Sequence, residues 1–146
     1  MTMDKGYLKL PVRIDAGNDA LEIELSFDIP ARFIYANNNV RANAGKVAVT
    51  KGPIVYAMEE IDNGSNLPAF AVDTNAGITE VWDNELFGGC MVLEVSGTRI
   101  ENEDASKACL YGTKPPREVP AKMRLVPYAY WNNRGKGEML VWMRRK

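Results

Sequence analysis

The sequence predicts an all-β protein, a jelly-roll-like antiparallel β-sandwich of about ten strands. Apolar and polar residues alternate over most of the chain, which is typical of strands with one buried face. The 12 glycines and 8 prolines are scattered, so no long helix fits between them. Short strands separated by regular turn signals are characteristic of sandwiches and barrels. We therefore expect a single domain over residues 6–143, with tails at 1–5 and 144–146.

Each element follows from this alternation. The first two strands are expected over Leu8–Ile14 and Leu21–Phe27, joined by a turn at Asp15–Asn18. The same pattern predicts further strands over Phe33–Tyr35, Lys46–Lys51, Ile54–Glu59, Ala69–Asp73, Ile78–Trp82, Met91–Val95, Cys109–Tyr111, Met123–Tyr130 and Glu138–Met143. Helical turns are expected only at Asn84–Phe87 and Asn102–Lys107.

Composition excludes several functions. The chain of 146 residues contains no histidine, which excludes a Ser-His-Asp triad, a Cys-His pair and a His-ligated zinc. It also has no apolar stretch long enough to span a membrane, so we expect no membrane partner. The amino terminus lacks the apolar core of a secretory signal, and a complete chain would therefore be cytoplasmic.

Charge is distributed unevenly along the chain. Residues 1–121 carry 11 basic and 18 acidic side chains, whereas residues 122–146 carry 7 basic residues and one acidic residue, Glu138. The net charge of −1 therefore combines −7 with +6. We expect the C-terminal strands to pair with the acidic body rather than to bind nucleic acid.

The two cysteines, Cys90 and Cys109, allow three states. We favour two free buried thiols over a disulfide or a zinc site, because zinc would need two further ligands. If Met91–Val95 pairs with Cys109–Tyr111 as a hairpin, Cys109 falls opposite Met91–Leu93 rather than Cys90.

Paired carboxylates could catalyse glycoside hydrolysis, and the chain offers Glu59-Glu60, Asp83/Glu85 and a loop group, Glu101/Glu103/Asp104. Adjacent residues of a strand point to opposite faces, so Glu59 and Glu60 should not face one substrate. The other two groups lie in polar loops, where solvated charge is the usual state. We therefore expect no catalytic residue, no metal site and no cofactor.

Aromatic residues suggest a contact surface. Of the three tryptophans, Trp142 lies in an alternating strand and is expected in the core, whereas Trp131 stands at a strand end. An aromatic and polar cluster at the tip of a sandwich suits contact with another domain or a ligand. Its members are Tyr130, Trp131, Asn133, Arg134 and Glu138.

Two stretches carry a family resemblance. Val40–Glu59 reads VRANAGKVAVTKGPIVYAME, and Leu125–Met143 reads LVPYAYWNNRGKGEMLVWM. In order and spacing they resemble the C-terminal part of family 127 glycoside hydrolases, the β-L-arabinofuranosidase family. The first stretch departs from the family pattern at Ala57, where that pattern has a cysteine.

The resemblance implies an accessory module. In that family an N-terminal (α/α)6 barrel holds a zinc-bound cysteine nucleophile and a catalytic glutamate, and β-sandwich domains follow it. Cys90 and Cys109 match neither site motif, so no catalytic role carries over to them. The implied partner is the catalytic barrel of a parent enzyme. Arg134 and Glu138, which flank the last turn, would pair across it or reach that partner.

Two other functions stay open at this point. One is a carbohydrate-binding module that uses Trp131 to bind arabinose-containing glycans. The other is a protein-interaction domain that forms a homodimer through an exposed strand or an apolar face.

Overall fold

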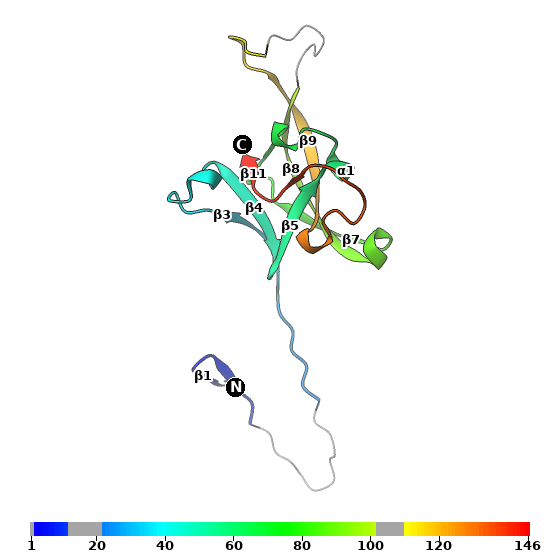
Figure 1. Cartoon of the computed structure of the whole chain (residues 1–146). Coiled ribbons are helices and arrows are strands. Elements are labelled where there is room, and N and C mark those ends of the chain that lie inside the picture. The colour runs from blue at the N-terminus through cyan, green and yellow to red at the C-terminus, as the bar shows by residue number, and fades with distance from the viewer. Residues whose placement is uncertain (1, 12–21, 102–109) are drawn as a thin grey trace.

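The structure is a computed structural model that describes residues 2–11, 22–101 and 110–146 (Figure 1). Three sequence expectations lie outside these residues: the strand portions at 12–14 and 21 with their connecting turn, the helical turn at 102–107, and the state of Cys109. No helix in the described part is both long enough and apolar enough to cross a membrane.

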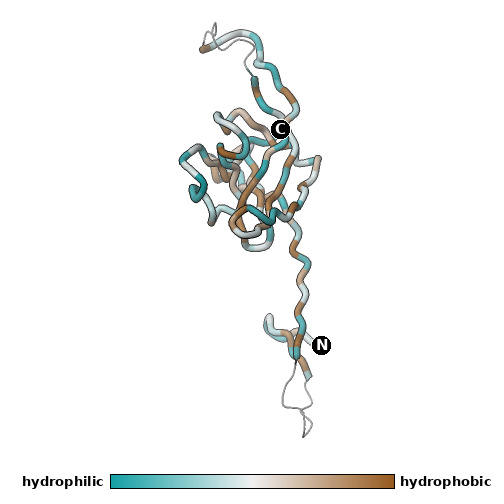
Figure 2. Tube along the Cα trace, turned by 90° about the vertical axis from the view of Figure 1, so that its right-hand side faces the viewer, coloured by the Kyte–Doolittle hydropathy of each residue, from teal (hydrophilic) through white to brown (hydrophobic). Residues whose placement is uncertain are grey.

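The amino terminus forms a small hairpin, and of the predicted first strand Leu8–Ile14 only Leu8 and Lys9 lie in a strand among the described residues 8–11. Strand β1 (Thr2–Asp4) pairs antiparallel with β2 (Tyr7–Lys9), and all residues of both strands are exposed. Figures 1 and 2 show this hairpin apart from the main sheet, to which residues 22–30 lead.

Residues 22–30 form no strand, so the expectation for Leu21–Phe27 is wrong over its described part. The alternation of apolar and polar residues is present, and Figure 2 shows it as alternating colours along this segment. Within the described part of the chain, however, no neighbouring strand supplies backbone hydrogen bonds to this segment, and every one of its residues is exposed. Alternation therefore shows that a segment can become a strand, while a partner decides whether it does.

The remaining strands form one sheet. They are β3 (Ala31–Tyr35), β4 (Lys46–Lys51), β5 (Ile54–Glu59), β6 (Phe70–Val72), β7 (Ile78–Asp83), β8 (Cys90–Glu101), β9 (Arg117–Pro127), β10 (Met139–Leu140) and β11 (Met143–Arg145). Short helices connect them: η1 (Arg41–Asn43), α1 (Glu60–Asn63), η2 (Leu67–Ala69), η3 (Leu86–Gly88) and η4 (Tyr128–Tyr130). The predicted helical turn at Asn84–Phe87 corresponds to η3.

The sheet closes into a barrel, which corrects the predicted sandwich while confirming the all-β class. Six strands pair in the ring β5-β9-β8-β6-β11-β4, and β4 pairs back to β5. Strands β3, β7 and β10 extend the ring at its sides. The pairing of β11 with β6 is parallel, so the sheet is mixed. A sandwich and a barrel both bury one face of every strand, and alternation therefore cannot distinguish them.

Two predicted strands differ in the structure, because the chain there pairs with other neighbouring strands than the alternation suggested. Strand β8 pairs with β9, beginning with Glu101 opposite Arg117. The predicted hairpin between Met91–Val95 and Cys109–Tyr111 is therefore wrong. Tyr111 is 91% exposed and lies in no strand. The predicted strand Glu138–Met143 divides in two, because β10 pairs with β5 whereas β11 pairs with β4 and β6.

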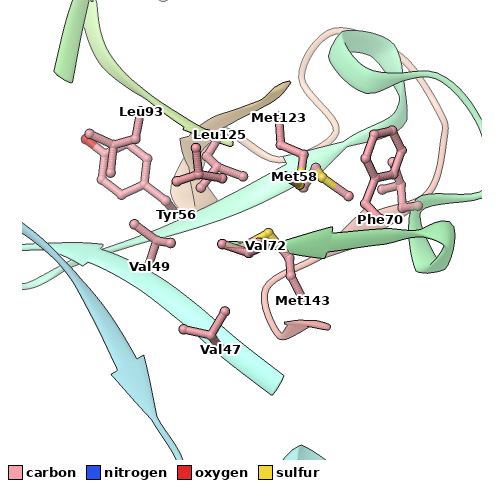
Figure 3. Close-up of a cluster of buried hydrophobic side chains, with 12 residues drawn as sticks. Val47, Val49, Tyr56, Met58, Phe70, Val72, Leu93, Met123, Leu125 and Met143 are labelled. Atoms are coloured by element: carbon pink, nitrogen blue, oxygen red, sulfur yellow. The ribbon is translucent and has the colours of Figure 1, made fainter. Parts of the chain in front are cut away.

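The barrel interior holds the core (Figure 3). Alternate residues of the ring strands point inward, and each fully buried side chain of this size contributes roughly 1.5–3 kcal/mol. The buried set comprises Val47, Val49, Tyr56, Met58, Leu67, Phe70, Val72, Leu93, Val95, Met123, Leu125 and Met143. Trp142 is only partly buried, and its expected place in the core is taken by its neighbour Met143.

Candidate functional site

The predicted contact residues come together at one corner of the barrel. Tyr130 ends η4, and Trp131, Asn133, Arg134 and Glu138 lie on the loop that leads from η4 to β10. This loop runs beside α1 and the end of β5, because Glu60 N donates to Glu138 O at 3.0 Å.

Arg134 anchors the loop through two carboxylates. Its guanidinium donates to Glu59 Oε2 at 2.5 Å, to Asp62 Oδ1 at 2.8 Å and also to Asp62 Oδ2. The side chains are 19% exposed for Arg134, 6% for Glu59 and 10% for Asp62. The hydrogen bond with Asp62, followed by that with Glu59, raises the pKa of Arg134 despite its partial burial. The guanidinium therefore stays charged and forms an ion pair with each of the two acids.

The second oxygen of Glu59 fixes the backbone of the same loop. Asn132 N donates to Glu59 Oε1 at 3.0 Å, and Asn132 has a left-handed backbone with φ of 64°. Such a conformation is unfavourable for most residues, so the bond to Glu59 helps to hold it.

Glu138 binds a different part of the body. Its Oε2 accepts from Leu67 N at 2.7 Å, and its own N–H donates to Glu60 Oε2 at 2.9 Å. The expected pairing of Arg134 with Glu138 across the turn is therefore wrong, because both side chains bind groups from the β5–η2 region. The prediction that Glu59 and Glu60 point to opposite faces of a strand is wrong, because Glu60 already begins α1 and both carboxylates bind backbone N–H groups of the same loop.

Four residues form an exposed apolar surface here, which we call the aromatic corner: Ile61, Tyr128, Tyr130 and Trp131. Their exposed fractions are 57%, 45%, 37% and 44%. The rings of Tyr128 and Trp131 stack with centroids 6.2 Å apart and planes 12° apart. Such amphipathic rings are typical of contact surfaces.

The aromatic corner rests on a second apolar cluster outside the barrel. Phe87 stacks on Tyr130 with centroids 4.4 Å apart, and the Arg134 guanidinium lies 5.5 Å from the Phe87 ring. Phe87 in turn packs on Cys90 and Val126. The rings are thus held from below by packing and by an ion-pair network.

Among the described residues, the hollow at this corner is too small for a sugar. A hollow lined by Ile61, Trp131, Gly137 and acidic side chains has a volume of only about 10 Å³. This space accommodates about one water molecule. A ligand would therefore have to lie on the exposed rings.

Cys90 is a free thiol and is 6% exposed. Burial, together with the nearby charge of Asp83, raises its pKa, so the reactive thiolate is disfavoured. Within residues 2–11, 22–101 and 110–146 no group of three or more potential metal ligands converges.

Asp83, another catalytic candidate, has a structural role. Its Oδ1 accepts from Glu85 N and Leu86 N, each at 2.9 Å, and Arg124 donates to its Oδ2. The bond from Leu86 N, then those from Arg124 and Glu85 N, lowers the pKa of Asp83. An ionised carboxylate that organises the η3 turn is a poor general acid.

Sequence reasoning missed the two acids that hold Arg134. Glu59 directly follows the buried residues Tyr56–Met58, and a carboxylate in that place is buried only when it is paired. The position of Glu59 in the sequence therefore already indicated that its carboxylate has a charged or hydrogen-bonding partner. Asp62 became a partner because α1 turns the chain back toward the loop, which no pattern in the sequence encodes.

Comparison with known proteins identifies the domain. The model of the glycoside hydrolase family 127 C-terminal domain matches residues 31–144. The chain is 38% identical over 149 residues to the non-reducing end beta-L-arabinofuranosidase of Bifidobacterium longum subsp. longum, and the match covers 99% of this chain and 22% of that relative.

Two solved structures agree. A GH127 beta-L-arabinofuranosidase from Geobacillus stearothermophilus T6 superposes with a TM-score of 0.77 at 41% identity, covering 82% of this chain and 19% of that one. A GH127 beta-arabinofuranosidase superposes with a TM-score of 0.71 at 28% identity, covering 82% and 18%. The chain thus spans about a fifth of the length of these larger relatives. It belongs to glycoside hydrolase family 127, in which it corresponds to the C-terminal domain.

Proposed function

We propose that this chain is a non-catalytic accessory domain of a β-L-arabinofuranosidase-type glycoside hydrolase and packs on the remainder of a longer enzyme. The observations that carry the proposal are the match of residues 31–144 to a C-terminal domain and the fact that the chain covers only 22% of the Bifidobacterium longum arabinofuranosidase. The chemistry of the described side chains supports it, since burial disfavours the thiolate of Cys90 and the carboxylates of Glu59 and Asp62 are both bound by Arg134.

The aromatic corner is the surface that we assign to this packing. Tryptophan, tyrosine and arginine are enriched where protein interfaces derive most of their binding energy. Because Arg134 and Phe87 already hold the loop, little conformational entropy would be lost when a second domain covers Trp131.

An activity assay tests the non-catalytic role. The purified 146-residue chain, incubated with an aryl β-L-arabinofuranoside, should release product no faster than a buffer blank. The Bifidobacterium longum relative serves as the positive control. Turnover by this chain at enzyme-like rates would disprove the proposal.

A chimera tests the assigned surface. In the Bifidobacterium longum relative, this chain would replace the matched segment, and the melting temperature would be measured with and without Trp131→Ala. We expect the substitution to lower the melting temperature of the chimera but not that of the isolated chain, because Trp131 is 44% exposed there. Tyr111→Ala removes another exposed ring, away from the corner, and should change neither. Equal effects in chimera and isolated chain would remove the corner as the interface.

Carbohydrate binding is the second candidate, favoured by the nearly parallel exposed rings of Tyr128 and Trp131. Tryptophan fluorescence, followed while arabino-oligosaccharides are added to millimolar concentration, distinguishes the two functions. A packing surface predicts no saturable change. A saturable change that Trp131→Ala abolishes would instead indicate a carbohydrate-binding module.

A further inference from the structure

A second hollow, distant in sequence from the aromatic corner, lies where the β3–β4 connection meets β11. Its volume is about 260 Å³, just below the range of about 300–1,000 Å³ for small-molecule sites. Residues 35–38 line one side, residues 43–46 another, and Arg145 closes it. Nothing in the proposed packing of the aromatic corner uses this hollow.

Hydrogen bonds within the connection shape the hollow before any ligand binds. Val40 N donates to Asn37 O at 2.9 Å, and Asn43 N donates to Val40 O at 3.0 Å. Arg145 N donates to Gly45 O at 2.9 Å, which holds β11 against the same loop. A site whose backbone is already ordered loses little entropy on binding.

The polar groups of the hollow are amides and cations. Asn37, Asn38 and Asn43 line it, together with Lys46 and Arg145, and no carboxylate does. A side-chain amide both donates and accepts hydrogen bonds, as sugar hydroxyl groups require.

The cations of the hollow have no acidic partner in the described part of the chain. Lys51, Arg124 and Arg134 each bind a carboxylate, but neither Lys46 nor Arg145 makes an ion pair there. The Arg145 guanidinium instead lies 5.8 Å from the centre of the Tyr35 ring, and Tyr35 is 52% exposed. Arg145 is thus placed at the hollow with hydrogen-bond donors available for an anion.

We propose that this hollow binds a single uronic-acid residue of a saccharide. The carboxylate pairs with Arg145, hydroxyl groups bond to the side-chain amides of Asn37 and Asn38, and an apolar face of the sugar packs on Tyr35. The volume admits one sugar ring, and the excess of positive charge selects an acidic sugar over a neutral one.

Isothermal titration of the folded 146-residue chain with D-glucuronate tests the proposal. We expect saturable binding in the millimolar range that Arg145→Gln weakens about tenfold, because a charge-assisted hydrogen bond is lost. Arg144→Gln is the matched control. It makes the same charge change at the adjacent exposed position of β11, whose side chain points to the other face, and should alter the affinity less than twofold. Circular dichroism establishes that both variants fold.

Three further ligands make the result decisive. L-Arabinose supplies hydroxyl groups without a carboxylate, acetate supplies a carboxylate without a ring, and inorganic phosphate supplies an anion of another shape. All three should bind at least fivefold more weakly than glucuronate. Equal binding of acetate or phosphate would show a general anion site, equal binding of arabinose would remove the role of charge, and no binding of glucuronate would overturn the proposal.

Discussion

Arg134 shows how one side chain can order a surface that it does not itself form. Its guanidinium joins Glu59 at the end of β5 to Asp62 in α1, and it also covers Phe87 beneath the aromatic corner. Removing one member of such a partly buried network is more harmful than its net contribution suggests, because the remaining charges stay without a partner.

Arg134→Met should therefore destabilise the domain by about 3 kcal/mol, measured by urea unfolding. Adding Glu59→Gln and Asp62→Asn in the same chain should recover part of the loss, since no buried charge then remains. Arg145→Met, at an exposed position, should change stability by less than about 0.5 kcal/mol. A loss below 1 kcal/mol for Arg134→Met would mean that solvent, rather than Arg134, stabilises the two carboxylates.

Gly97 illustrates a requirement for space rather than for backbone freedom. A Cβ atom at this position of β8 would lie 1.9 Å from Ala71 O of β6. Gly97→Ala should thus force the two strands apart and lower the free energy of unfolding by about 3 kcal/mol. Gly112→Ala is the control, since a Cβ there meets no atom within 4 Å and should be nearly neutral. Equal midpoints for the two variants in a denaturant titration would contradict this account.

At the scale of elements, the strands whose ends could be predicted are those that residues in the sequence itself bring to an end. β4 and β5 begin and end where predicted, because Gly52-Pro53 separates two alternating runs. β9 starts earlier and ends earlier than predicted, since its bounds depend on pairing with β8 and on the turn into η4. The predicted contact residues lie at one corner, and their role in contact stays a prediction; their partners depended on α1 and η2, which the alternation does not reveal.

Three elements are joined by the carboxylate of Glu80 on β7. Its Oε2 accepts from Lys51 Nζ of β4 at 2.7 Å, and its Oε1 accepts from Ala31 N of β3 at 2.8 Å. The bond from Lys51, followed by that from Ala31 N, lowers the pKa of Glu80 below the ordinary 4.5. Lys51 also donates to Ile29 O at 2.6 Å, which fixes where residues 22–30 leave the barrel.

This junction predicts a pH dependence. A carboxylate with a lowered pKa in the folded state contributes stability that is present above its unfolded pKa and is lost as the pH falls through its folded pKa. Glu80→Gln should thus be less stable than the wild type at pH 7, and the difference should shrink as the pH falls below 4.5. Thermal melts across this range measure it. A difference that is the same at pH 7 and at pH 3 would show that the charge of Glu80 is irrelevant.

At the scale of the whole molecule, the separation of charge along the chain has a structural counterpart. Two basic residues of the C-terminal segment, Arg124 and Arg134, bind acids of the body as expected. Arg145 instead borders the β3–β4 hollow, where no carboxylate lines the surface. The positive C-terminal segment therefore pairs in part with acids of the body and leaves Arg145 as a cationic group at the β3–β4 hollow.

Because the ring of six strands closes without residues 22–30, we expect this segment to contribute little to the stability of the domain. Leu25 and Phe27 are 62% and 73% exposed on residues 22–30, which pair with no described strand. Replacing both with serine should change the free energy of unfolding by less than about 0.5 kcal/mol each, as for other exposed sites.

The same double substitution should reduce self-association, because an exposed apolar strand-forming segment is a template for pairing between chains. Light scattering at increasing protein concentration measures this, with Val49→Ser as a control that damages the barrel interior itself. If the double variant instead melts several degrees lower while remaining as associated as the wild type, residues 22–30 pack on the barrel in solution. The closed ring of six strands would then not be the complete folding unit.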